Sequence, residues 1–317
     1  MLMKTIIIDG NNLLYRTFHA NNKHGDPEEV IISMCILTAL YKINQYYRKF
    51  EPDEVVIAFD DYSWRKEYTK DLSKCVTNKK YKGHRRTDKT AKEMRMFAKL
   101  DEHIQEFADM LKTHTRIIVL QRHYLEGDDL MAAWVQMHRD DENIVISGDK
   151  DMMQLLRYPG VTLIDIGTDN ERTLEEYNGD ADLFLFEKCF RGEAKNNDNI
   201  QSAYPRLYKT KIVKAYEDEY IRTEVMSNKF KQLEELPDGT IEEVEYKTED
   251  LHKENMLLMS LRHQPNRIKV MMVKEVERGK AERGRYNHMS FLRFCTANDL
   301  QAIVDKVEDF VPLLAVK

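Results

Sequence analysis

The stretch NIVISGDKDMMQLL, residues 143–156, contains the pattern on which the predicted fold depends. Its first part is a short apolar run, typical of a buried strand, and its last part has the apolar content of a helix. Between them stand Asp149 and Asp151, separated by a single lysine. Two carboxylates at the end of a strand repel each other, so we expect them to serve a purpose beyond ending the strand.

The same order of strand, acid and helix recurs along the chain. Strands that alternate with helices predict a mostly parallel sheet in an α/β domain. Beyond residue 180 the strand signal fades, so we predict two domains, 1–180 and 181–317. Strands are predicted over 4–9, 54–61, 115–120, 143–147 and 161–166, helices over 28–50, 90–112, 126–138, 181–190, 204–235, 250–278 and 298–310, and a turn over 237–240.

The composition excludes several classes of protein. The 317 residues are 42% hydrophobic, enough for a core, and the net charge of −6 argues against a protein that coats DNA generally. No apolar run reaches the roughly 18 residues of a membrane helix, and the N-terminal stretch is too short and acidic for a signal peptide. The four cysteines lie far apart, which predicts reduced core residues. We expect a soluble, cytoplasmic monomer without a membrane partner.

Residues 62–95 form a strongly basic segment in this acidic chain. Such a segment favours contact with a polyanion, although a solvated helix face has the same composition. Charge alone leaves both interpretations open. The segment holds twelve Lys or Arg (Arg65, Lys66, Lys70, Lys74, Lys79, Lys80, Lys82, Arg85, Arg86, Lys89, Lys92, Arg95) against four acids (Glu67, Asp71, Asp88, Glu93).

Acidic residues follow each of the first four predicted strands. Ligands of parallel α/β sheets gather at the carboxyl ends of the strands. A helix N-cap explains one such acid, but not acids after four strands, because clustered carboxylates repel unless a cation neutralises them. Oxygen ligands without His or Cys favour Mg²⁺ or Mn²⁺. The acids are Asp9, Asp60, Asp61, Glu126, Asp128, Asp129, Asp149 and Asp151.

The acids and the basic segment together indicate an activity on phosphodiesters. Two hard cations about 4 Å apart can activate a water and stabilise the leaving oxygen of a phosphodiester. The basic segment leaves the second strand at the end of the sheet where the acids lie. The residues alone therefore predict a metal-dependent nuclease with a cationic substrate clamp.

Four motifs resemble those of the 5′-nuclease family and occur in the family's order. The family includes the 5′-nuclease domain of bacterial DNA polymerase I, flap endonucleases, and phage ribonuclease H and 5′-exonucleases; the C-terminal part is most similar to the phage members. The resemblance implies a PIN-like, mostly parallel sheet flanked by helices, a basic helical arch over 62–95, and a mainly helical DNA-binding C-terminal region. The motifs are DGNNLLYRTFHA (9–20), YKGHR (81–85), EGDDLMA (126–132) and SGDKDMMQLL (147–156).

The resemblance also implies a metal-binding role for most of the acids. Asp129 matches a position that is acidic in many members and acts through water. Asp128, Asp149 and Asp151 are expected to take part directly in catalysis. The residues that match the family's metal-binding carboxylates are Asp9, Asp60, Glu126, Asp128, Asp149 and Asp151.

Several residues match substrate-binding positions of the family. Arg16 matches a basic residue that contacts substrate phosphate; the alternative is a surface base on a helix. Lys82 and Arg85 match bases of the arch expected to act in catalysis and substrate binding, and Arg86 beside them is expected to bind substrate. Tyr81 either stacks on a base or packs within the arch, and both alternatives stay open.

One motif departs from the family pattern. The family carries Gly-Asp-x-x-Asp-Asn after the nuclease core, supplying acids for a second metal. Here Asp198 matches the second acid, the first is replaced by Glu193, and the spacing is two residues longer. Glu193 either ligates the second metal or is a surface acid. The glycine-rich turn that follows in the family is missing, which leaves the mode of duplex binding open.

The implied activity is that of a 5′-3′ exonuclease and flap endonuclease, with ribonuclease H-type activity on RNA–DNA hybrids and two Mg²⁺ (or Mn²⁺) ions. The expected substrates are 5′-flap, nicked and RNA-primed duplexes, and the expected role is RNA-primer removal in phage-type DNA replication, with a single-strand-binding or clamp protein as a partner. Rival hypotheses are a single-stranded ribonuclease of the PIN type and a non-catalytic nucleic-acid-binding protein. A haloacid-dehalogenase-like phosphatase would need Asp-x-Asp where this chain has Asp9-Gly10-Asn11.

Overall fold

The computed structural model describes residues 2–22, 26–77, 80–83, 89–193, 200–235 and 240–316. The chain forms two compact units that are not consecutive in sequence. The sheet unit contains Met1–Tyr62, Thr90–Thr173 and Arg267–Lys317, and the helical unit contains Ser63–Lys89 and Leu174–Asn266. The predicted division into domains 1–180 and 181–317 stays a prediction.

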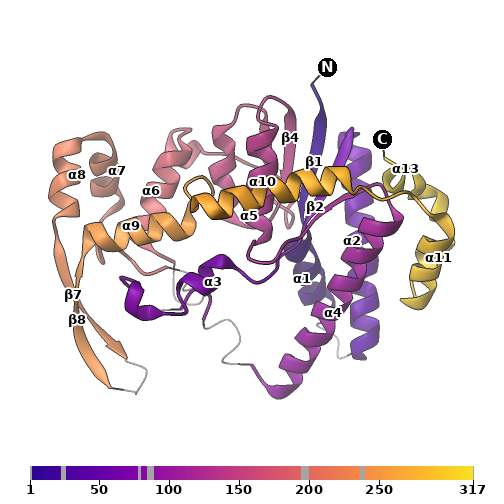
Figure 1. The fold of residues 1–317 in the computed structure, drawn as a ribbon, viewed down its shortest axis with the longest axis horizontal. Coiled ribbons are helices and arrows are strands. Elements are labelled where there is room, and N and C mark those ends of the chain that lie inside the picture. The colour runs from indigo at the N-terminus through magenta and orange to yellow at the C-terminus, as the bar shows by residue number, and fades with distance from the viewer. Residues whose placement is uncertain are drawn as a thin grey trace. The chain divides into compact units, whose positions relative to one another are not determined.

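A six-stranded sheet forms the centre of the sheet unit (Figure 1). Its order is β3-β2-β1-β4-β5-β6, and all neighbours are parallel except β5 and β6, which confirms the predicted mostly parallel sheet. Because β1 lies between β2 and β4, the chain order reverses there, and such a point is where parallel sheets bind ligands. The strands are β1 (Lys4–Asp9), β2 (Glu54–Ala58), β3 (Ile118–Leu120), β4 (Glu142–Ile146), β5 (Val161–Ile164) and β6 (Glu171–Arg172).

Local sequence explains where the main elements begin and end. Ile6, Ile7 and Ile8 are fully buried, as expected for a strand covered on both faces. Helix α2 (Glu28–Phe50) has two acids in its first turn and two bases in its last turn, which suits the helix dipole. Helix α4 (Ala91–His114) begins at a capping box in which Thr90 and Glu93 satisfy each other's backbone amides.

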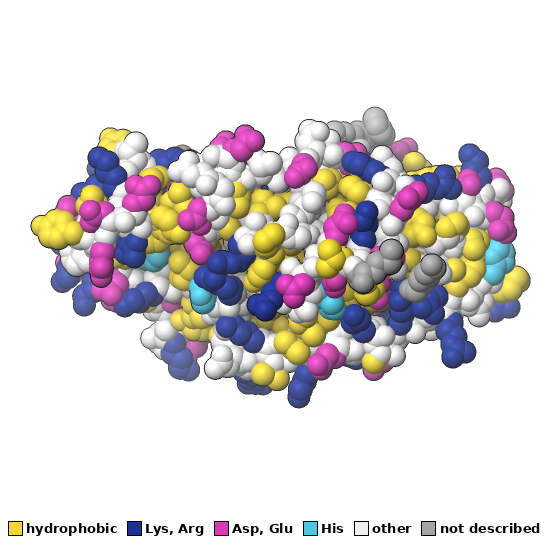
Figure 2. Space-filling model, turned by 90° about the horizontal axis from the view of Figure 1, so that it is seen from above, with side chains coloured by type: hydrophobic (Ala, Val, Ile, Leu, Met, Phe, Trp, Pro, Cys, Tyr) yellow, Lys and Arg dark blue, Asp and Glu magenta, His cyan; other side chains and the backbone are white. Residues whose placement is uncertain are grey.

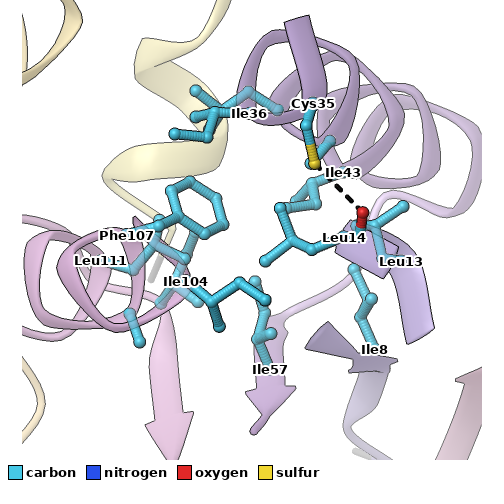
Figure 3. Packing of buried hydrophobic residues seen from close by; sticks show 14 of the residues in the cluster. Ile8, Leu13, Leu14, Cys35, Ile36, Ile43, Ile57, Ile104, Phe107 and Leu111 are labelled. Carbon is cyan, nitrogen blue, oxygen red and sulfur yellow. Dashed lines mark hydrogen bonds between the residues drawn. The ribbon is translucent and has the colours of Figure 1, made fainter. Parts of the chain in front are cut away.

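One face of the sheet is covered by α1 (Gly10–Asn21), α2, α4 and α11 (His288–Ala297). Figure 3 shows side chains from β1, β2, α1, α2 and α4 meeting in this core, where the Cys35 thiol donates to the Leu14 carbonyl at 3.1 Å. Phe291 and Phe310 belong to the same core although they lie far along the chain. Residues 267–317 therefore complete the hydrophobic core of the sheet.

The other face carries α5 (Gly127–Met137), which contacts β1 and β2, and α10 (Asn266–Ala281). At Gly279 a Cβ atom would come within 2.5 Å of Leu120 Cδ2, so α10 packs closely on β3. The remaining elements of this unit are η2 (Lys150–Arg157), α12 (Gln301–Val304), η4 (Val307–Asp309) and α13 (Val311–Leu314).

The helical unit has its own core, in which Phe186 and Phe190 pack with Ile212, Val225 and Leu251. The prediction of a helix over 204–235 is wrong at its end, because residues from Lys229 form a strand of a hairpin. The elements are α3 (Trp64–Tyr68), η1 (Leu72–Lys74), η3 (Glu175–Tyr177), α6 (Ala181–Arg191), α7 (Lys209–Glu217), α8 (Glu219–Met226), β7 (Lys229–Glu235), β8 (Ile241–Lys247) and α9 (Thr248–Met259).

Smaller differences from the predictions have local causes. The segment 250–278 is two helices, α9 and α10, and Pro265 stands just before the second. The segment 298–310 is two short helical turns, and α11 was not predicted. The predicted turn at 237–240 lies, except for Thr240, outside the described residues. Three of the four cysteines are buried as predicted, whereas Cys75 is half-buried.

Within the described ranges, no helix combines the length and the apolar character needed to cross a bilayer.

Candidate active site

The predicted acids of the sheet unit lie at the carboxyl ends of four strands. Asp9 is the last residue of β1, and Asp60 follows β2 by two residues. Glu126 is the N-cap of α5, which follows β3, and Asp149 is the N-cap of η2, which follows β4. Since these strands are parallel neighbours, the four positions share one edge of the sheet, at the point where the chain order reverses.

The carboxylates of β1, β2 and β4 influence one another electrostatically. Burial raises the pKa of Asp9 from 3.8 to about 7, and the charge of Asp60 adds to the rise. Hydrogen bonds from Asn12 and Ser147 lower that pKa, while the charge of Asp149 raises it further. Asp9 is only 7% exposed, so its negative charge has little water to stabilise it. A cation at this edge would remove the electrostatic cost of gathering the three acids.

Ser147 links the acids of β1 and β4. Its hydroxyl donates to Asp9 Oδ2 at 2.9 Å and accepts from the backbone amide of Asp149 at 3.0 Å. The other oxygen of Asp9 accepts from the Asn12 amide at 2.9 Å. Ser147 is fully buried, so its orientation is fixed by these contacts.

Two consecutive asparagines at the start of α1 hold the neighbouring strand ends. The Asp60 amide donates to Asn11 Oδ1 at 2.8 Å, and the Gly148 amide donates to Asn12 Oδ1 at 3.0 Å. A Cβ atom at Gly148 would lie 2.8 Å from Asn12 Oδ1, so glycine is needed for this close approach. The sequence predictions missed Ser147, Asn11 and Asn12; the only signal was a polar pair directly after Asp9-Gly10.

The acids of α5 have structural contacts as well. Asp60 Oδ1 accepts from the Gly127 amide at 2.7 Å. Glu126 and Asp129 form a capping box, in which the fully buried Asp129 accepts from the Glu126 amide. This contact gives Asp129 a role in starting the helix, while its predicted role through water stays a prediction. Asp128 is half-buried in the first turn of the same helix.

Asp149 and Asp151 form a short turn at the end of β4. The Asp151 amide donates to Asp149 Oδ1 at 2.8 Å, and Asp151 is 6% exposed. The predicted helix after them is the 3₁₀ helix η2. Lys150, between the two acids, is exposed.

The donor set fits a hard divalent cation, because every candidate ligand is a carboxylate oxygen. As the side chains lie, no group of three or more His, Cys, Asp or Glu within the described ranges has the spacing to hold a metal ion. Oxygens of Asp9, Asp60 and Asp149 instead accept from backbone amides. Coordination by three of these carboxylates would therefore require their side chains to rotate from the positions they have here.

The predicted substrate-binding residues are divided between the two units. Arg16 is exposed on α1, with its guanidinium against Gly167, where a Cβ atom would overlap it. In the helical unit Tyr81 is 6% exposed, its amide donates to Thr69 Oγ1, and Lys82 Nζ lies 5.1 Å from its ring centroid. This burial favours packing over base stacking for Tyr81. Arg85 and Arg86 lie outside the described residues.

The second group of predicted metal ligands belongs to the helical unit. Glu193 Oε1 lies 2.8 Å from Lys188 Nζ, and both side chains are only 15% exposed. Glu193 is therefore engaged in an ion pair, but it is largely buried and not a surface acid. Asp198 lies outside the described residues, so ligation by Glu193 and Asp198 stays a prediction.

The surface charge agrees with a chain of modest net charge. Figure 2 shows Lys and Arg side chains interspersed with Asp and Glu on the face that it presents. Many of the described bases pair with acids of their own unit, such as Lys231 with Glu243 at 2.7 Å. Long-range attraction of a polyanion by the whole surface is therefore weak, and binding depends on local groups.

The model of the 5′-3′ exonuclease N-terminal resolvase-like domain matches residues 4–182, more than half of the chain. The chain belongs to the 5′-3′ exonuclease family. This match covers the whole acidic edge of the sheet and confirms the predicted 5′-nuclease resemblance. A comparison with the curated proteins found no match to the chain.

Solved structures of a bacteriophage T5 protein share the fold of this family member. The T5 D15 protein co-crystallised with metal ions is 18% identical, with a TM-score of 0.62, and the match covers 87% of this chain and 99% of that chain. The T5 5′-exonuclease with bound zinc gives the same values. A T5 D15 flap endonuclease variant in a pseudo-enzyme–product complex with DNA and metal ions is 17% identical, with a TM-score of 0.61, covering 88% and 99%.

Proposed function

We propose that this chain is a metal-dependent 5′-nuclease. It hydrolyses phosphodiesters of duplex DNA and RNA–DNA hybrids from the 5′ side and at 5′ flaps. The supporting observation is the buried Asp9 carboxylate, which is influenced by the charges of Asp60 and Asp149 at the reversal point of the sheet, in a chain of the 5′-3′ exonuclease family. The similar T5 protein is described as a flap endonuclease and was crystallised with DNA.

Two Mg²⁺ or Mn²⁺ ions are the proposed cofactors. When bound, such ions supply a hydroxide nucleophile at neutral pH and stabilise the leaving oxygen. The first ion would be held by acids of the sheet unit, and Glu193 and Asp198 are proposed as ligands of the second. The acids of the sheet unit are Asp9, Asp60, Glu126, Asp128, Asp129, Asp149 and Asp151.

Basic side chains of the protein would hold the substrate phosphates, and hydrogen bonds would keep the catalytic acids aligned. Lys82 and Arg85 offset the negative charge that develops on the scissile phosphate. Arg16 and Arg86 bind neighbouring phosphates as point contacts that fix the register of the strand. Ser147 keeps the Asp9 carboxylate aligned through its 2.9 Å hydrogen bond, so that the acid does not turn away from the site.

The proposed biological role is removal of RNA primers and 5′ flaps during phage-type DNA replication, in the host cytoplasm. The substrate would be a 5′-flap, nicked or RNA-primed duplex, and a single-strand-binding or clamp protein would be the partner that delivers it. The enzyme would act as a monomer.

The test compares Asp151→Asn with a matched control, Asp140→Asn. Asp140 has a side chain that is 94% exposed and lies outside the acidic edge. Labelled 5′-flap, nicked and RNA-primed duplexes are incubated with Mg²⁺ and the products are mapped. We expect Asp151→Asn to lose at least about 100-fold in rate, and the control to match the wild type.

Cleavage by Asp151→Asn at close to the wild-type rate would refute the assignment. Retention of DNA without metal-dependent cleavage by the wild type would favour the non-catalytic alternative. Titration calorimetry with Mn²⁺ alone measures metal binding without activity, and the Asp151→Asn variant should bind more weakly than the control.

A further inference from the structure

Three aromatic rings lie together beside the acidic edge of the sheet unit. We call Tyr62, His123 and Tyr124 the rim cluster. The rings of Tyr62 and His123 are stacked, with centroids 5.5 Å apart and an interplanar angle of 22°. The ring centroid of Tyr124 lies 4.5 Å from that of His123 and 6.0 Å from that of Tyr62. Such offset and edge contacts are the favourable geometries for aromatic pairs.

Two members of the rim cluster, Tyr62 and His123, are exposed, and Tyr124 is half-buried. Tyr62 is 37% exposed, and the His123 side chain is 60% exposed. Tyr81, the aromatic residue that the sequence indicated for base stacking, is 6% exposed. Exposed aromatic faces that are grouped together are typical of a surface that binds a flat ligand.

The rim cluster is joined to the acids by short chain connections. Tyr62 is two residues from Asp60, so their Cα atoms lie within about 7.6 Å, and Tyr124 is likewise two residues from Glu126. The two segments are also tied together, since the Asp61 amide donates to the Leu125 carbonyl at 3.2 Å. The rings are therefore carried by the same two short segments as Asp60 and Glu126, which are proposed to act on the phosphodiester.

The backbone that presents the rings is strained and held in place. Tyr124 has a φ of +76°, a conformation that costs an aromatic residue free energy and persists only where its surroundings fix it. The Gln121 amide donates to the buried Glu275 carboxylate at 3.0 Å, and the Leu125 amide donates to the Arg122 carbonyl at 3.0 Å. His123 is oriented by a 3.0 Å contact between its Nδ1 and Asp61 Oδ1. These contacts hold the rings in position before any ligand arrives.

We propose that the rim cluster binds an unpaired nucleobase of the substrate, next to the scissile phosphate, by stacking against Tyr62 and His123. The proposal rests on the proposed nuclease function and adds a base-binding site to it. A nucleobase fits because its phosphate would lie at the acids while its flat face meets the rings. Stacking accepts every base, so the site favours substrates with an unpaired nucleotide at the cut over fully paired ones, without reading sequence.

The test uses the full chain and 5′-flap duplexes in which single nucleotides flanking the cut are replaced by an abasic residue. The variants are Tyr62→Ala, His123→Ala and the ring-retaining Tyr62→Phe, with Tyr220→Ala as the control for loss of an exposed tyrosine, since Tyr220 is 82% exposed on α8. A second readout is the fluorescence of 2-aminopurine at the same nucleotide, measured in EDTA, which reports stacking without cleavage.

We expect an abasic residue at one flanking position to raise the KM of the wild type about 10-fold, with a smaller effect on kcat. Tyr62→Ala and His123→Ala should already have the raised KM, gain no further penalty from the abasic residue, and lose the 2-aminopurine signal. Tyr220→Ala should behave like the wild type in both readouts. Tyr62→Phe, which keeps the aromatic ring, should retain the abasic penalty and the 2-aminopurine signal that Tyr62→Ala loses.

Equal KM values of the wild type on intact and abasic duplexes would overturn the proposal. So would an abasic penalty that persists in Tyr62→Ala and His123→Ala, because another surface would then hold the base. A wild type that cleaves no 5′-ended duplex would refute the proposed nuclease function itself, and the base-binding site with it.

Discussion

Replacing Asp9 with Asn should stabilise the metal-free fold while removing a metal ligand. The fold raises the pKa of Asp9 from 3.8 to about 7, mainly by burial and then by the charge of Asp60. A carboxyl group whose pKa is raised in the folded state contributes most to stability below pH 3.8. That contribution is lost as the pH rises through 7, because the folded state must then hold a buried negative charge.

The size of the effect follows from the shift. About three pH units at 1.36 kcal/mol each give a destabilisation of about 4 kcal/mol at pH 8. At pH 5 only the part between 3.8 and 5 has developed, on the order of 1–2 kcal/mol. Asn keeps an acceptor for the Asn12 amide and can bond to Ser147, so the variant should gain about 3 kcal/mol more over the wild type at pH 8 than at pH 5.

Urea unfolding in EDTA at pH 5 and pH 8 measures this difference directly. The same measurement with Mn²⁺ should stabilise the wild type more than Asp9→Asn, because ligand binding to the folded state adds to its stability and the variant has lost one proposed ligand. An Asp9→Asn variant that is less stable than the wild type at pH 8 in EDTA would refute the reasoning. So would an advantage of the variant that does not change between the two pH values.

Two further predictions concern the helical unit. The carboxylate of Glu254, which is 4% exposed, accepts hydrogen bonds from the backbone amides of Val76 at 2.8 Å and Thr77 at 2.9 Å. Glu254→Ala should therefore lower the free energy of unfolding in urea by about 3 kcal/mol. Substitution of the exposed Glu249 with Ala should lower it by less than about 0.5 kcal/mol, and equal losses would contradict this reasoning. Burial lowers the pKa of His252 from 6.5 to about 4, so as the pH falls the unfolded state takes up a proton before the folded state does. The free energy of unfolding should therefore fall by about 3 kcal/mol between pH 7 and pH 4. His252→Leu should lack this fall, and a pH dependence equal to that of the wild type would contradict the prediction.

The acidic edge could be predicted from the sequence because strand periodicity and strand ends are local signals. Once 4–9, 54–61 and 143–147 are recognised as buried strands, the parallel fold places Asp9, Asp60 and Asp149 at one edge. The structure confirms this arrangement and the mostly parallel sheet. It also shows that the charges of Asp60 and Asp149 raise the pKa of Asp9, which no spacing in the sequence could establish.

The hairpin β7–β8 was missed because its sequence satisfies two patterns at once. Lys229, Lys231 and Leu233 alternate with Phe230 and Gln232, which is the period of a strand, yet these residues are also tolerated in helices. What decides between the two is the pairing with residues 241–247, a contact made by a segment that follows a turn. Propensity within a short window cannot contain that information.

The side chains that support the acids were missed for a different reason. Ser147, Asn11 and Asn12 act through hydrogen bonds between strands that are distant in sequence, such as Ser147 to Asp9. In the sequence they are ordinary cap residues. For Tyr81 the sequence left base stacking and packing equally open, and the fold buries its ring.

The interleaving of the two units has a consequence for synthesis of the chain. Every acid of the sheet unit proposed to bind a metal has been translated by residue 151. Phe291, Phe310 and Leu314, which belong to the same core as α2 and α4, are translated much later. The Arg116 amide donates a hydrogen bond to the Leu314 carbonyl at 2.8 Å, and this bond cannot form until residue 314 has been translated. A nascent or prematurely terminated chain thus carries the acids without a finished core to position them. Because these core residues follow the helical unit in the chain, the proposed nuclease activity should arise only after both units have been made.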